Sequence, residues 1–319
     1  MKTSYSSYLW LIFSFLFLLS LTTGCARPYY YISRAYPGNL PVRAEITETP
    51  FYPQKSHQCG PAALTMVLNW SGSQVALKQV TAEIYTPGRK GTLQPLLISA
   101  TRDYDRLPYL IHEFEDLLQE LSAGHPAIVL QNNGLTWFPR WHYAVLIGYD
   151  SEKQIVILRS GEMFRKEISW SLFRRTWERA GKWGLIALPL TELPASASEA
   201  SYLEAVLSLE KVKHFKAAVT AYKTALKRWP ASQGALMGLG NCRYALGDLV
   251  GAEKAFRRAI KICQTCGDSY NNLSQVLAEQ RHYNAAMKAA GEAIRLGGPN
   301  IEIYRQTLED IKQMKIKGK

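Results

Sequence analysis

The chain has 319 residues, of which 47% are hydrophobic and 20% are charged, and its formal net charge is +12. This composition excludes a disordered, collagenous or polytopic membrane protein, and the length favours two domains. Five cysteines in a chain of this length are too few for a fold built on disulfide bonds.

Residues 1–24 have the features of an export signal. Lys2 is their single charge, and an apolar run of thirteen residues follows it from Leu9 to Leu21. As a helix that run spans about 20 Å, which is short of the roughly 30 Å hydrocarbon core of a bilayer. A short apolar core followed by small residues is typical of a cleaved secretory signal.

The five residues that end at Cys25, LTTGC, resemble the bacterial lipobox, in which cleavage exposes a cysteine that is then lipidated. The resemblance implies a lipid anchor on Cys25, and Ala26 in place of an aspartate favours the outer membrane. We therefore expect a protein of the bacterial cell envelope that faces the periplasm, with residues 25–44 as a linker. An ordinary cleaved signal with an incidental Cys25 is the alternative. Because an exported chain rarely meets nucleic acid, we expect no nucleic-acid partner.

Residues 45–190 contain both helical and strand patterns and do not repeat. Apolar or alternating runs predict strands at 127–130, 143–147 and 154–158, and helical patterns at 61–70, 93–101 and 111–122 precede them. Helices followed by a meandering sheet indicate an α+β domain.

The segment around Cys59 is the part of this domain that indicates chemistry. Pro61 suits the first turn of a helix, because its missing N–H group is not needed there. Cys59 then stands just before the helix start, where unpaired backbone N–H groups and the positive helix end favour a thiolate. Gly60 would let a substrate backbone approach closely. Gln54, five residues upstream, is placed to donate an amide hydrogen to a developing oxyanion.

A thiolate nucleophile needs a base, and His142 opens the strand predicted over 143–147. Its side chain is therefore expected at the rim of the sheet rather than inside the apolar stretch. A cysteine at a helix start that faces a histidine at a strand start is the arrangement of papain-like peptidases.

These residues resemble a known family, the bacteriocin-leader cysteine peptidases. The resemblance rests on Gln54 and on the segments QCGPAAL (58–64), GHPAIV (124–129) and HYAVLIGYD (142–150). Members are best known as exporter domains that cut after a double-glycine leader. The resemblance covers residues 45–190 and implies a papain-like α+β fold with Cys59 as nucleophile, His142 as general base and Gln54 as oxyanion donor. We expect neither a cofactor nor a metal.

The sequence departs from this family at the third catalytic position. The family has an aspartate, often followed by proline, on the strand after the histidine strand, whereas this chain has Arg159 and Ser160 there. Asp150 is expected to lie too far from His142. Glu162, a backbone carbonyl or Ser160 is left to orient the imidazole.

The last third of the chain contains a repeat of 34 residues. Alanines recur at this spacing at positions 218, 252 and 286 and again at 225, 259 and 293, with Tyr222, Phe256 and Ala290 between them. The pattern resembles about three tetratricopeptide repeats over residues 200–298, followed by a terminal helix at 300–315. It implies an all-α solenoid over residues 198–319. We expect this solenoid to recruit a protein partner, and a mere spacer is the alternative.

The sequence thus predicts an exported, lipid-anchored thiol peptidase that acts on a peptide or protein substrate. A non-catalytic binding protein or scaffold on a degenerate peptidase fold is the alternative, and the missing aspartate favours it. Cys263 and Cys266 form either a local disulfide or two idle thiols, because a single pair supplies only two of the four ligands that zinc prefers.

Overall fold

The computed structural model describes residues 39–54 and 57–317. The predicted signal at 1–24, the predicted lipidation residue Cys25 and the first part of the linker lie outside the described residues. Between residues 39 and 317, leaving out the gap at 55–56, no helix is long and apolar enough to cross a bilayer.

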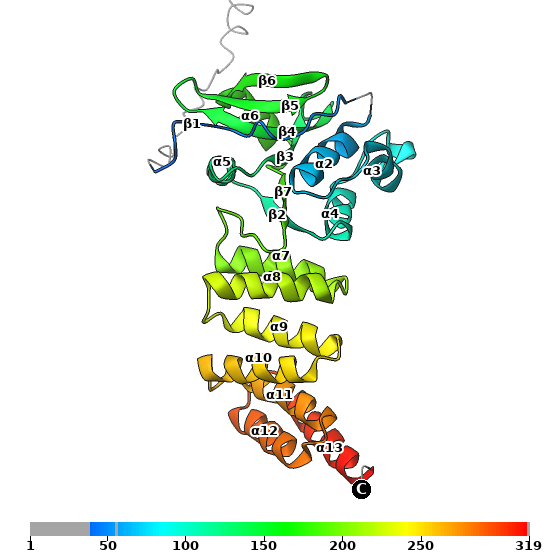
Figure 1. The fold of residues 1–319 in the computed structure, drawn as a ribbon, viewed down its shortest axis with the longest axis vertical. Coiled ribbons are helices and arrows are strands. Elements are labelled where there is room, and N and C mark those ends of the chain that lie inside the picture. The colour runs from blue at the N-terminus through cyan, green and yellow to red at the C-terminus, as the bar shows by residue number, and fades with distance from the viewer. Residues whose placement is uncertain (1–38, 55–56, 318–319) are drawn as a thin grey trace, which may run out of the picture. The chain divides into compact units, whose positions relative to one another are not determined.

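The first domain is built on a seven-stranded antiparallel sheet in the order β2-β7-β3-β4-β5-β6, with β1 paired to β4 (Figure 1). The strands are β1 (Arg43–Glu45), β2 (Arg106–Ile111), β3 (Ala127–Asn132), β4 (Trp141–Asp150), β5 (Ile155–Ser160), β6 (Met163–Ser169) and β7 (Gly184–Pro189). The first half of β4 pairs with β3 and its last residues pair with β1, while β5 lies on its other side. The long strand β4 therefore organises the sheet.

Helices pack on both faces of this sheet. The helices of the domain are α2 (Cys59–Trp70), α3 (Leu77–Ile84), α4 (Gln94–Asp103), α5 (Phe114–Ser122) and α6 (Trp170–Glu178). Helix α2 is buried from Gly60 to Leu68 and shares one apolar core with Leu130 and Val145 of the sheet. Helix α6 reaches the other face, where Gln131 Nε2 donates a hydrogen bond of 2.7 Å to Thr176 Oγ1. Successive strand residues point to opposite faces of the sheet. Leu130 therefore faces α2, whereas its neighbour Gln131 faces α6.

The predicted strands at 127–130, 143–147 and 154–158 are confirmed, as are the helices predicted at 61–70 and 93–101. The expected order of helices before strands is wrong. Strand β2 runs between α4 and α5, and the helix predicted from residue 111 begins at Phe114. Because β2 is buried on both faces over Leu107–Tyr109, its sequence lacks the alternation that marks a half-buried strand.

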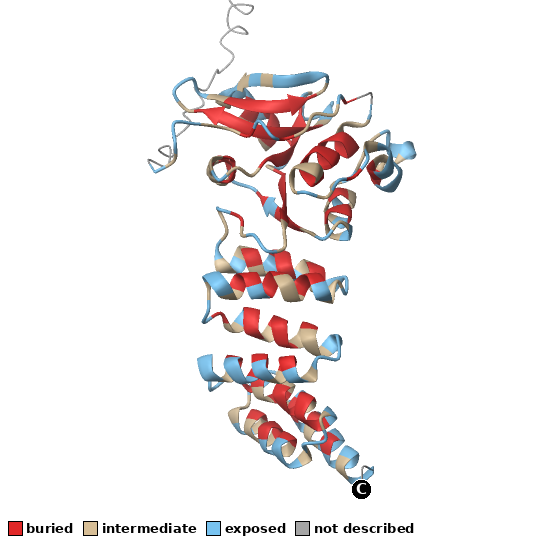
Figure 2. Cartoon of the chain, in the orientation of Figure 1, coloured by how far each residue is buried: buried red, intermediate tan, exposed pale blue. Residues whose placement is uncertain are grey.

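The second domain is a solenoid of paired helices. They are α7 (Glu199–Lys211), α8 (Phe215–Arg228), α9 (Gln233–Ala245), α10 (Leu249–Ile262), α11 (Gly267–Glu279), α12 (Tyr283–Leu296) and α13 (Ile301–Lys317). All six alanines of the 34-residue spacing have 0% exposure. Figure 2 shows buried residues recurring along each of these helices. The small alanines therefore let paired helices approach closely, as the repeat predicts.

Aromatic rings lie directly against glycines where helices of the solenoid meet. A Cβ atom added to Gly238 would lie 2.2 Å from the Tyr222 ring, and one added to Gly240 would lie 2.4 Å from the Phe256 ring. Helix α9 therefore receives one ring from α8 and another from α10. Gly267 of α11 accepts the Tyr304 ring of α13 in the same way, at 2.8 Å.

We expect Gly240→Ala to destabilise the repeat domain by about 1–3 kcal/mol, the usual range for overpacking. Phe256 is 1% exposed, so its ring has no room to retreat. Gly291 of α12 is the matched control, because a Cβ there meets nothing within 4 Å. Gly291→Ala should stabilise by about 0.5–1 kcal/mol through helix propensity. Urea unfolding followed by circular dichroism measures the free energy of unfolding of both variants. Equal changes in that free energy would contradict close packing of the Phe256 ring on Gly240.

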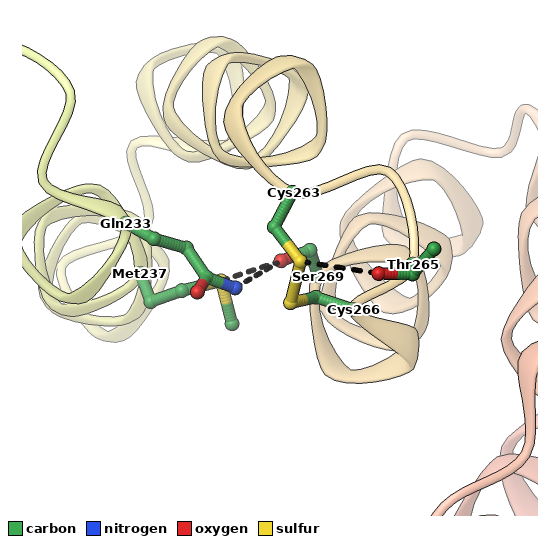
Figure 3. The surroundings of a disulfide bond; sticks show 6 residues. All are labelled: Gln233, Met237, Cys263, Thr265, Cys266 and Ser269. Atoms are coloured by element: carbon green, nitrogen blue, oxygen red, sulfur yellow. Dashed lines mark hydrogen bonds between the residues drawn. A yellow bond between two sulfur atoms is a disulfide. The ribbon is translucent and has the colours of Figure 1, made fainter.

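Cys263 and Cys266 form a disulfide bond across the turn between α10 and α11, with Cα atoms 5.5 Å apart. This is one of the two states that the sequence left open. Beside the bond, Ser269 Oγ donates to Met237 Sδ at 3.2 Å and accepts from Gln233 Nε2 at 3.5 Å (Figure 3). The bond therefore closes the turn where α11 contacts α9.

Candidate active site

One cavity of about 800 Å³ in the described residues is lined by all three predicted site residues, Cys59, His142 and Gln54. Its walls include the start of α2 with the residues before it, residues 89–94, the start of β4, and Gly161 at the turn between β5 and β6. The cavity is open to solvent at the end of the sheet where β4 begins. The topology thus brings together residues that are far apart in the sequence.

Cys59 is the first residue of α2, whereas the sequence predicted it just before the helix. Its side chain is partly exposed. Gln58 occupies the N-cap position and makes no side-chain capping bond. His57 has a positive φ of 64°, which turns the chain into the helix. Backbone N–H groups of the first turn therefore remain available beside the thiol. Pro61 lies in the first turn, as predicted.

Gly60 has a different role from the one expected. A Cβ atom at this position would lie 2.7 Å from Thr92 Cβ, so the glycine admits the segment 91–93 of the chain itself. That segment forms one wall of the cavity. The space beside Gly60 is therefore filled by Thr92 of the cavity wall, and it is not free for a substrate backbone.

His142 is oriented by Ser160, with Nε2 2.8 Å from the Ser160 hydroxyl oxygen. Val145, which packs with α2, lies opposite Arg159, so His142, Ala144 and Ser160 belong to the other face of the sheet. His142 lines the cavity because it stands at the exposed start of β4, beside Trp141. Of the three groups that the sequence left to orient the imidazole, Ser160 occupies the position. Glu162 is exposed at the turn.

Arg159 points to the opposite face and is 1% exposed. Its NH2 group donates to the carbonyl oxygens of Thr47 at 3.3 Å and Thr49 at 3.1 Å, and its guanidinium lies 3.6 Å from the Phe164 ring centre. Arg159 therefore holds the segment after β1 and takes no part in the cavity. Asp150 lies at the other end of β4, eight residues or about 26 Å from His142, as expected.

The pKa of His142 is lowered to about 4, first by burial and then by the positive charge of Lys166. The imidazole is therefore neutral near pH 7 and able to accept a proton. A carboxylate beside Nε2 would only accept a hydrogen bond and would fix the proton there. The Ser160 hydroxyl can accept or donate, so it leaves both imidazole tautomers available.

Within residues 39–54 and 57–317, no hydrogen bond joins Cys59 Sγ to His142. Tyr143, the next residue of β4, packs into the core that contains α2, and its hydroxyl donates to the Thr92 carbonyl at 3.2 Å. Burial, followed by the nearby Cys59, raises the pKa of Tyr143. The thiol and the imidazole thus line the same cavity without a hydrogen bond between them in the described residues. Catalytic hydrogen bonds are often long without substrate and shorten when it binds.

Gln54 is buried and held on both sides of its amide. Its Nε2 donates to the Tyr143 carbonyl at 3.2 Å, and its Oε1 accepts from the Gly161 N–H at 2.8 Å. The second Nε2 hydrogen has no partner among the described residues, and Gln54 lines the cavity. The amide is therefore positioned rigidly with one donor to spare.

Sequence reasoning missed the wall formed by residues 89–94, including the exposed cations Arg89 and Lys90. A short 3₁₀ helix, η1 (Pro87–Arg89), and a bridge between Thr86 and Gly91 present this segment. No motif marks it. Trp141 also lines the cavity and is 56% exposed.

Comparisons with known proteins match the two domains separately. Residues 46–184 match the family model described as Peptidase_C39 like, and residues 203–265 match a tetratricopeptide-repeat model. No curated protein matches the chain.

Among solved structures, one described as a C39-like peptidase from Bacillus anthracis has 18% identity and a TM-score of 0.41, covering 46% of this chain and 97% of its own. The first repeat domain of Spaghetti (RPAP3), bound to an HSP90 peptide, has 16% identity and a TM-score of 0.34, covering 36% of this chain and 90% of its own. MamA has 18% identity and a TM-score of 0.34, covering 38% and 67%.

Proposed function

Because this chain joins a Peptidase_C39-like domain to tetratricopeptide repeats, we propose that it is a cysteine peptidase whose nucleophile is Cys59 and whose general base is His142. One observation carries the proposal. A thiol at a helix N-terminus, a neutral histidine and a rigid amide donor line the same cavity of about 800 Å³. These are the groups that peptide hydrolysis through a thioester needs.

In the proposed reaction, the thiol proton moves to His142 as Sγ attacks the peptide carbonyl carbon. Nε2 is bonded to Ser160, so Nδ1 is the nitrogen that receives the proton. The second Nε2 hydrogen of Gln54 stabilises the oxyanion. His142 then gives the proton to the leaving amine as the C–N bond breaks. Water hydrolyses the thioester and restores the thiol.

Alkylation of Cys59 by a fluorescent iodoacetamide tests this proposal. At about pH 6.5 an ordinary thiol, with a pKa of about 8.5, is only about 1 per cent thiolate. Helix-end N–H groups and His142 should make Cys59 react several-fold faster in the native chain than in the denatured chain, as followed by peptide mapping. His142→Ala should remove most of that difference. If native Cys59 reacts no faster than denatured Cys59, the peptidase proposal fails.

A non-catalytic scaffold is the second candidate, and a specific observation favours it. The imidazole of His142 is bonded to a hydroxyl instead of a carboxylate, and no hydrogen bond connects it to Cys59 in the described part of the chain. In a scaffold the cavity would bind a peptide without cleaving it. Slow alkylation of Cys59 that is indifferent to His142 is the result expected for this candidate.

We also propose that the chain is exported and anchored through lipid on Cys25, facing the periplasm from the outer membrane. The support is the sequence LTTGC after a short apolar run. Cys25→Ser should leave the protein without incorporated fatty acid and move it to the aqueous phase in detergent phase separation. Unchanged partitioning, together with no fatty acid in the parent protein, would remove the anchor from the proposal.

A further inference from the structure

A second hollow lies in the repeat domain, bordered by α8, α9 and α10, with a volume of about 360 Å³. Its floor is apolar, because Leu239 and Ala255 are buried and Leu226 is half-buried there. Its other lining residues are all cations and include no acid: Lys223, Lys227, Arg243, Lys254 and Arg258. A rim of one charge around an apolar floor distinguishes this hollow from an ordinary gap between helices.

The basic excess of the repeat domain is concentrated in these helices. Residues 211–262 contain 11 Lys and Arg against 2 Asp and Glu, whereas the rest of 195–319 contains 8 against 9. Arg243 has Asp248 as a partner, with Nε and Oδ2 3.7 Å apart. The other four rim cations form no ion pair within the described residues. Like charges repel, so this cluster does not stabilise the fold.

The rim cations form two rows. Lys223 and Lys227 are four residues apart on α8, and Lys254 and Arg258 are four apart on α10, so each pair lies on one face of its helix. The rows border the floor of Leu226, Leu239 and Ala255. A flat lipid surface would meet the rim charges but leave the floor empty. A polypeptide segment with carboxylates beside an apolar side chain can fill both.

We propose that this hollow binds an acidic segment of the protein that the repeats recruit, with an apolar side chain on the floor and carboxylates on the two rows. The inference rests on the proposed recruiting role of the repeats and specifies the chemistry of the partner. The active-site cavity carries the same sign of charge, because Arg89 and Lys90 line it. An acidic substrate therefore suits both sites.

The test uses the full chain and a fluorescent peptide of about twelve residues, rich in glutamate around a central leucine. Anisotropy should report binding that weakens with ionic strength. A peptide with glutamine for glutamate, and another with glycine for leucine, should each bind at least about tenfold more weakly. If the parent chain binds the glutamate and glutamine peptides with equal affinity, the proposal is wrong, and this comparison needs no variant of the protein.

Two double variants locate the site. Lys227→Glu with Arg258→Glu should weaken peptide binding about tenfold or more. Lys216→Glu with Lys261→Glu makes the same charge change on the same two helices outside the lining of the hollow, and should change binding by less than about threefold. Equal weakening by both variants would show diffuse attraction and overturn the site.

Vesicles of phosphatidylglycerol are the competing probe. If the chain binds them through Lys227 and Arg258 but does not bind the glutamate peptide, the partner is a membrane and the proposal is wrong. None of these readouts requires Cys59. A negative peptide-binding result therefore does not contradict the peptidase proposal. Slow alkylation of Cys59 likewise does not contradict the proposal that the hollow binds an acidic segment.

Discussion

Cys59→Ala is expected to abolish peptide hydrolysis by the full chain, lowering kcat by about 10⁴-fold or more. His142→Ala should lower it by a similar factor, because a nucleophile and its base act as a unit and their losses do not add. The measurement is the release of new amino termini from an acidic protein substrate. Both variants should keep the parent circular dichroism spectrum.

Cys242→Ala is the matched control for this prediction. Cys242 is buried in α9, where burial and the nearby Glu210 raise the pKa of its thiol to about 12. It is therefore inert near neutral pH, and its removal should leave hydrolysis unchanged. Hydrolysis that survives in Cys59→Ala would assign the activity to another residue or a contaminant.

The same reaction should have an unusual acid limit. The neutral form of His142 is the active base, and its pKa of about 4 means that protonation begins only at low pH. Hydrolysis should therefore persist as pH falls through 6.5, the ordinary histidine pKa, and decline only as it approaches 4. Ser160→Asp would put a carboxylate beside Nε2, raise the pKa of His142 and move the acid limit upward. Ser160→Ala should not move it upward.

Gln54→Ala is expected to reduce kcat by about 10²–10³-fold, the usual effect of losing one oxyanion donor. The Cys59 alkylation rate should change little, because alkylation develops no oxyanion. Since Gln54 also bonds to Tyr143 and Gly161, loss of structure must be separated from loss of the donor. Gln54→Glu lacks the amide hydrogens and keeps an acceptor for the Gly161 N–H, but it turns a buried carboxylate oxygen toward the Tyr143 carbonyl and should lower the thermal midpoint by a different amount from Gln54→Ala.

We therefore expect both variants to lose kcat to a similar extent although their thermal midpoints differ, with the Cys59 alkylation rate little changed in either. Peptide hydrolysis under single-turnover conditions provides the rate, and calorimetry provides the midpoint. A kcat loss that follows the midpoint across both variants would assign Gln54 a purely structural role.

Much of the site was accessible from the sequence because local signals fix it. Pro61 and the apolar residues after it specify the helix α2 just after Cys59, although α2 includes Cys59 itself, and the apolar residues after His142 specify β4. The 34-residue spacing likewise specifies the paired repeat helices. Two of the strands that were not predicted gave weak signals, because β1 has three residues and β6 is an edge strand whose residues are mostly exposed. The other two, β2 and β7, are mostly buried and lack the alternation of a half-buried strand.

The choice between Arg159 and Ser160 illustrates what sequence patterns could not provide. A shift of one residue in strand pairing exchanges the two faces of a sheet. Pairing here shifts between Leu146 and Gly148 of β4, and again between Leu158 and Ser160 of β5. Only the three-dimensional register shows that Ser160 faces the imidazole. The cavity wall at residues 89–94 depends on long-range contacts in the same way.

The rings that enter α9 from both sides bear on how the solenoid opens. Gly238 holds the Tyr222 ring of α8, and Gly240 holds the Phe256 ring of α10. Helix α9 cannot detach from one neighbour without disturbing its contact with the other, so local opening of this helix involves three helices at once. In native-state hydrogen exchange, the amides of α8, α9 and α10 should therefore exchange as one cooperative unit. The basic hollow that these helices border would then be lost or kept as a whole.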